Sequence, residues 1–156
     1  MSIKRIIFDD LLNHLPKPEI TVIIGPRQIG KTYLMRQMQT HAEQRHQKTM
    51  YLNLDIENHR HYLDSQSIFL DYLRLQLGTG KGIIFLDEIQ RKTDAGLFLK
   101  GLYDMKLPYK FVVSGSGSLD IKAHIKESLT GRKRFPNLSI SKPTINMKKN
   151  LSNTFA

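Results

Sequence analysis

The sequence predicts an α/β fold in which a mainly parallel sheet is flanked by helices. Four short apolar runs, rich in β-branched or aromatic residues, alternate with segments whose apolar residues have helical spacing. Strands that alternate with helices pair in parallel, because each helix returns the chain to the start of the next strand. A glycine-containing loop with a phosphate-binding pattern connects the first apolar run to the helical segment that follows it. Parallel sheets bind their ligands at such strand-to-helix connections.

The first half of the chain contains two predicted helices and two predicted strands. A lead-in helix over residues 2–15 has apolar residues at helical spacing and ends at Pro-Lys-Pro. The strand over 19–25 is almost entirely apolar, which is typical of a strand covered on both faces. A helical pattern over 31–44 and a second strand over 49–55 follow.

The second half repeats the alternation. A helix over 65–77 has Ser65 or Ser67 as its candidate N-cap, and a buried strand follows over 83–88. We expect a helix over 93–105 despite its two glycines, a strand over 109–118, and a last helix over 119–129.

Length and composition indicate one domain in a reducing compartment. The chain has 156 residues, of which 40% are hydrophobic and 24% charged, and it has no cysteine. The missing cysteine excludes disulfides and thiolate metal sites. No apolar run approaches the length of about 20 residues that spans a bilayer, and the N-terminus does not resemble a signal peptide. We therefore expect a cytoplasmic protein without a membrane partner.

The net charge of +10 is concentrated near the C-terminus, since residues 121–156 alone carry +7. We divide the chain into a core over 1–134 and a basic, poorly ordered tail over 135–156, with a short edge strand at most, from Leu-Ser-Ile or Thr-Ile-Asn. The charge is either a solvated end or a contact for nucleic acid or an acidic partner. Few aromatic residues are present there for bases to stack on.

Residues 25–32, Gly-Pro-Arg-Gln-Ile-Gly-Lys-Thr, match the phosphate-loop pattern between a strand and a helix. Glycines leave room for backbone amides to surround phosphates, and the helix N-terminus adds free amides and partial positive charge. The lysine is expected at the β- and γ-phosphates and the threonine hydroxyl at Mg²⁺. The predicted nucleotide-binding residues are Gly25, Pro26, Arg27, Gln28, Ile29, Gly30, Lys31 and Thr32.

An acidic pair, Asp87 and Glu88, follows the apolar part of the strand over 83–88. Parallel sheets place ligands at this end of their strands. We expect Asp87 to orient Mg²⁺ and its waters, and Glu88 to act as general base toward an attacking water.

Two further candidates are weaker on spacing alone. Ser114 or Ser116, at the end of the fourth strand, can contact the γ-phosphate or the water, or simply belong to a Gly/Ser turn. Arg132 is either an arginine finger, acting within its own chain or from a neighbouring subunit, or a basic helix end.

Five segments in this order (ITVIIGPRQIGKTYL, YLNLD, IIFLDEIQR, FVVSGSGS and ESLTGR) resemble a prokaryotic group of AAA-type P-loop ATPases that usually carry a C-terminal domain of unknown function. The resemblance covers about residues 1–134. It implies a RecA-like core of the additional-strand type, with an extra strand between those of the phosphate loop and Asp87. It also implies Asp87 as Mg²⁺ ligand, Glu88 as the residue that primes water, a polar residue of Ser-Gly-Ser as first sensor, and a nucleotide-responsive Arg132.

The sequence departs from that group after Arg134, where we see none of the usual second domain and expect a truncated member. The predicted function is Mg²⁺-dependent ATP binding and hydrolysis, with a possible homo-oligomer. A non-hydrolysing nucleotide-binding module or inactive remnant is the alternative, and a small-molecule kinase is a weaker one. The chain has no Asn-Lys-x-Asp guanine-reading motif, which favours ATP over GTP.

Overall fold

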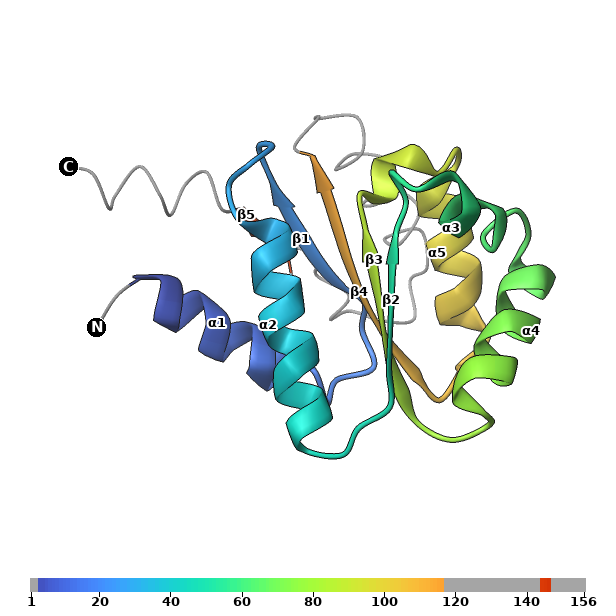
Figure 1. Cartoon of the computed structure of the whole chain (residues 1–156), viewed down its shortest axis with the longest axis horizontal. Coiled ribbons are helices and arrows are strands. Elements are labelled where there is room, and N and C mark those ends of the chain that lie inside the picture. Colours follow the sequence, from blue (N-terminus) through green and yellow to red (C-terminus); the bar gives the residue numbers. More distant parts are fainter. Residues whose placement is uncertain (1–2, 117–143, 147–156) are drawn as a thin grey trace.

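A computed structural model describes residues 3–116 and 144–146 of the chain. All strand pairs in its five-stranded sheet are parallel, and the strand order is β2-β3-β4-β1-β5 (Figure 1). The strands are β1 (Thr21–Gly25), β2 (Thr49–Asn53), β3 (Gly82–Asp87), β4 (Tyr109–Ser116) and β5 (Thr144–Asn146). The helices are α1 (Ile3–His14), α2 (Lys31–Gln44), α3 (Glu57–His61), α4 (Gln66–Leu77), the 3-10 helix η1 (Ile89–Arg91) and α5 (Ala95–Asp104). The predicted mainly parallel α/β architecture is confirmed.

Helices cover both faces of the sheet, α1 and α2 on one side and α4 and α5 on the other (Figure 1). The alternation of side chains along each strand divides the core accordingly. In β1, Val22 and Ile24 belong to the cluster with α4 and α5, whereas Ile23 belongs to the cluster with α1 and α2. Because every residue of β1 and β3 is buried, both strands read as continuous apolar runs in the sequence.

The fourth strand lies inside the sheet rather than at its edge. Its parallel partners are β1 on one side and β3 on the other, so β4 separates the phosphate-loop strand from the strand of Asp87. This is the additional-strand arrangement that the resemblance implied, and it is confirmed.

The short strand β5 corresponds to the Thr-Ile-Asn segment and pairs with Val22–Ile24 of β1 at the edge of the sheet. An edge strand in the basic tail was predicted. The predicted helix over 119–129 and Arg132 lie outside the described residues. Within the described ranges, no helix is long and apolar enough to cross a membrane.

Two short helices, α3 and η1, were not predicted, whereas the longer ones were. Of the two candidate N-caps of α4, the structure has Ser65, whose hydroxyl accepts a hydrogen bond from the amide of Ile68 at 3.2 Å. Helix α2 has the predicted bounds, and its buried residues include Met35, Met38 and Ala42.

Candidate functional site

The candidate site lies where the carboxyl ends of β1, β3 and β4 meet. The register places Gly25 of β1 beside Ser116 of β4, and Ile23 beside Ser114. Leu86 pairs with Val113, so the acidic pair that follows Leu86 stands level with the two serines. A parallel sheet with β4 in the middle therefore gathers the predicted loop, acids and hydroxyls at one edge.

The phosphate loop turns through left-handed backbone. Gly30 has φ +97°, and a Cβ built there would meet nothing within 4 Å. The glycine is thus required by its backbone conformation rather than by crowding. Gln28 also adopts positive φ, at 61°. The loop then enters α2 directly, so that the first turn of this helix presents its amides at the site.

Lys31 is the first residue of α2, and only 4% of its surface is exposed. Its ammonium group donates to the carbonyl oxygens of Gly25 at 2.9 Å and Pro26 at 2.7 Å, so the side chain spans its own loop. Burial lowers the pKa of Lys31, and the nearby carboxylates of Glu88 and Asp87 oppose that shift. No carboxylate of the described residues forms an ion pair with this ammonium.

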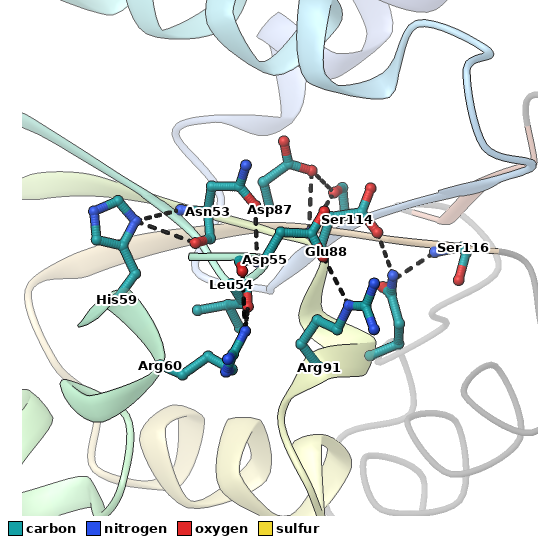
Figure 2. Close-up of polar contacts among 11 residues, drawn as sticks. Asn53, Leu54, Asp55, His59, Arg60, Asp87, Glu88, Arg91, Ser114 and Ser116 are labelled. Carbon is teal, nitrogen blue, oxygen red and sulfur yellow. Dashed lines mark hydrogen bonds and ion pairs between the residues drawn. The ribbon is translucent and has the colours of Figure 1, made fainter. Parts of the chain in front are cut away.

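Asp87 ends β3 and is fully buried, and four donors hold its carboxylate. Its Oδ2 accepts from the hydroxyls of Thr32 at 2.6 Å and Tyr51 at 2.5 Å. Its Oδ1 accepts from the Ser114 hydroxyl and from the backbone amide of Glu88, the latter at 3.1 Å (Figure 2). Such a buried carboxylate is stabilised by these hydrogen bonds, and it links the loop, β2 and β4.

Glu88 is half-buried and has left-handed backbone, with φ 60°. Its amide lies 3.2 Å from the Ser114 hydroxyl, and Figure 2 shows the two residues side by side with Asp87. The side-chain amide of Gln90 donates to the Glu88 carboxylate, while its oxygen accepts from the backbone amide of Ser116 at 3.2 Å. Gln90 therefore joins the carboxylate of Glu88 to the end of β4.

Most of the predicted site residues lie together. The loop, the acidic pair and Ser114 are in direct contact, and Ser116 joins them through its backbone. Arg132 lies outside the described residues.

Sequence reasoning missed the contacts of Tyr51 and Gln90 at the site. Neither residue is among the predicted site residues. The register between β2 and β3, rather than a motif, brings Tyr51 to the site. The register pairs Tyr51 with Phe85 and Asn53 with Asp87, so Tyr51 and Asp87 face the same side of the sheet.

The end of β2 is tied to the helix that follows the acidic pair. Asp55 forms an ion pair with Arg91 of η1 at 2.7 Å. Arg60 donates to the carbonyl oxygens of Leu54 and Asp55, and the His59 ring contacts the backbone of Asn53 (Figure 2). The Asp55–Arg91 pair joins the turn after β2 to the turn after β3, and the contacts of Arg60 and His59 hold the turn after β2 against α3.

A phosphate loop between β1 and α2, with an acidic pair at the end of a strand two positions away in the sheet, defines a P-loop nucleoside triphosphatase. The chain belongs to the AAA domain family, whose model matches residues 17–141. The prediction of an AAA-type P-loop ATPase is thereby confirmed, and with it a nucleotide-binding, ATPase type of function.

Curated relatives include an uncharacterised protein of Mycobacterium bovis, Mb2031c, and one of Mycobacterium tuberculosis, Rv2008c. Each is 32% identical to this chain over 126 residues, which are 80% of this chain and 26% of the relative. The chain thus spans about a quarter of the length of these relatives.

Solved structures of similar fold include the replication initiator DnaA bound to AMPPCP and single-stranded DNA, with a TM-score of 0.53. That match has 14% sequence identity and covers 78% of this chain and 43% of the other. A DNA replication initiation factor matches with a TM-score of 0.52 and 14% identity, over 96% of this chain and 58% of the other. At these identities the likeness concerns the fold alone.

Proposed function

We propose that this chain binds ATP together with Mg²⁺ at the phosphate loop and hydrolyses it to ADP and phosphate. The observation that carries the proposal is the buried ammonium of Lys31, whose hydrogen-bond partners are two neutral carbonyl oxygens. A buried cation in direct contact with neutral oxygens alone is costly, and the carboxylates of Glu88 and Asp87 act on it without forming an ion pair. The phosphates of a nucleotide, cradled by residues 25–32, would bring negative charge into direct contact with it.

The residues beside the loop fit a Mg²⁺ ion, which prefers oxygen ligands. Thr32 donates its hydrogen to Asp87, which leaves the lone pairs of the Thr32 oxygen available to a cation. We therefore assign Thr32 and Asp87 to the metal. When bound, Mg²⁺ would neutralise part of the phosphate charge.

Glu88 is the proposed general base for hydrolysis. Its carboxylate stands at the carboxyl end of β3, one residue beyond Asp87, and Gln90 fixes its direction. A carboxylate held in this way can take a proton from water during attack on the γ-phosphate. Ser114, which contacts the Glu88 amide, or Ser116, whose backbone contacts Gln90, is the proposed sensor of that phosphate. Arg132 is proposed to stabilise charge on the transferred phosphate, from its own chain or a neighbouring one.

Two further observations support ATP as the nucleotide and water as the acceptor of its γ-phosphate. The DnaA structure of similar fold contains AMPPCP, which favours an adenine nucleotide here. The general base and the serines near it favour water over a second substrate as the acceptor, and so argue against a small-molecule kinase. A module that binds ATP without hydrolysing it is the competing proposal.

Replacing Glu88 with glutamine separates these proposals. Glu88→Gln is expected to keep Mg-ATP affinity and to lose at least about 100-fold in turnover, because the amide cannot accept the proton. Phosphate release and calorimetric binding are measured on the same preparations. Glu57→Gln, on α3 and exposed, is the matched control and should behave as wild type.

Hydrolysis by Glu88→Gln at the wild-type rate would contradict the assignment of the base. Binding by the wild-type chain without measurable turnover, unchanged in Glu88→Gln, would favour the non-hydrolysing module.

A further inference from the structure

We propose that the hydroxyl of Tyr51 positions Asp87 for Mg²⁺, so that Tyr51 controls how strongly nucleotide binding depends on the metal. The inference rests on the proposed function and adds to it a positioning residue on β2, outside both the phosphate loop and the acidic pair. Tyr51 touches neither nucleotide nor metal in this proposal, and it acts through Asp87.

The geometry of the carboxylate carries the argument. The Tyr51 Oη lies 2.5 Å from Oδ2 of Asp87, and this is the same oxygen that accepts from Thr32. The other oxygen has donors of its own, the Ser114 hydroxyl and the Glu88 amide. Each oxygen of this fully buried carboxylate therefore has two donors, and Tyr51 supplies one of the two on Oδ2.

The tyrosine ring has two contacts of its own. It stacks on Phe85 of β3, with a centroid separation of 6.2 Å and an interplanar angle of 21°. The guanidinium carbon of Arg36 lies 3.4 Å from the ring centroid. Since Arg36 belongs to α2, four residues after Thr32, the ring contacts both the helix of the phosphate loop and the strand of Asp87.

The Tyr51 hydroxyl becomes important when the Thr32 hydroxyl binds a cation. If Thr32 were the only donor to Oδ2, any movement of its hydroxyl toward a metal would leave that oxygen without a donor, and only the contacts of Oδ1 would orient the carboxylate. The Tyr51 hydroxyl keeps that oxygen bonded whatever Thr32 does. Asp87 then stays in one orientation with and without the metal, and Mg²⁺ meets a preformed site.

The test is Tyr51→Phe, which removes the hydroxyl and keeps the ring. Titration calorimetry with ATP is run over a range of Mg²⁺ concentrations and again in EDTA. We expect Mg-ATP affinity to fall about tenfold and half-maximal binding to need more Mg²⁺, while ATP affinity in EDTA stays within about twofold of wild type. Circular dichroism, recorded at the same temperature, verifies that the variant is folded.

The matched control is Tyr33→Phe. Tyr33 lies next to Thr32 on α2, is 68% exposed, and accepts a hydrogen bond from Gln37 rather than contacting Asp87. The Tyr33→Phe variant should leave the affinity for Mg-ATP and the affinity for ATP in EDTA unchanged. Wild-type behaviour of Tyr51→Phe at every Mg²⁺ concentration would overturn the inference, as would an equal loss with and without Mg²⁺. A wild-type chain that binds no Mg-ATP would instead refute the proposed function itself.

Discussion

Gly30 illustrates how one residue sets the shape of the phosphate loop. Its φ of +97° is open to glycine but strained for a residue with a Cβ, although a Cβ there would meet no atom within 4 Å. The strain belongs to the backbone alone, so a substitution tests backbone conformation without a steric clash.

Gly30→Ala is expected to lower the free energy of unfolding by about 1–2 kcal/mol, because alanine is forced into left-handed backbone. Urea denaturation measures this loss. Gly80→Ala is the control, since a Cβ at Gly80 also meets nothing within 4 Å but its backbone is not left-handed. Equal stability of the two variants would show that the conformation of Gly30 is not what requires glycine.

At the residue scale, the sequence predicted the groups that form a motif and missed those that only meet in space. Lys31, Thr32, Asp87 and Glu88 could be found because their spacing and their strand and helix context carry the signal. Tyr51 carries none, since one tyrosine in an apolar strand reads as packing. Its contact with Asp87 depends on β2 lying beside β3 in one register, which the sequence does not show.

At the element scale, α1 is fastened to the sheet by a polar cluster at the amino ends of the strands. His14 Nδ1 lies 2.6 Å from the Thr21 hydroxyl of β1 and 3.1 Å from the ammonium of Lys110 of β4. Lys110 also donates to the carbonyl oxygens of Lys17 and Glu19 in the connection from α1 to β1. A neutral imidazole suits this position, because both neighbours can donate to it.

The cluster predicts a loss of stability in acid. Burial, followed by the charge of Lys110, lowers the pKa of His14 from 6.5 to about 4. As the pH falls from 6.5 to 4, His14 is protonated in the unfolded chain but stays neutral in the folded chain. The free energy of unfolding therefore decreases with falling pH. The contribution of this half-buried group is at most about 3 kcal/mol.

His14→Gln should flatten the dependence of the unfolding free energy on pH between 6.5 and 4, since glutamine does not titrate. Urea denaturation of both proteins across this range measures the two slopes. If the slope of the variant equals that of the wild type, His14 is not the group responsible.

Element prediction succeeded where local pattern decides and failed where tertiary contacts decide. The continuously buried strands β1 and β3 are visible in the sequence as apolar runs, and the longer helices as apolar residues at helical spacing. Helix α3 has five residues and η1 has three, and side-chain contacts such as Asp55 with Arg91 fix their surroundings. Helices this short are not stable alone, so their sequence carries little signal.

At the scale of the whole molecule, the chain is an AAA-type P-loop domain, and its match spans about a quarter of the length of the curated relatives. The described residues bring the loop, the acidic pair and the end of β4 together, and Asp87 and Lys31 are both buried there. The central claim is that this arrangement binds Mg-ATP.

Titration calorimetry of this chain with Mg-ATP tests that claim most directly, with Lys31→Ala as the comparison. The account predicts wild-type binding with a dissociation constant of roughly micromolar size, and a loss of most of that affinity in Lys31→Ala because the ammonium no longer faces the phosphates. Absence of binding by a wild-type chain shown by circular dichroism to be folded, or equal binding by Lys31→Ala, would contradict it.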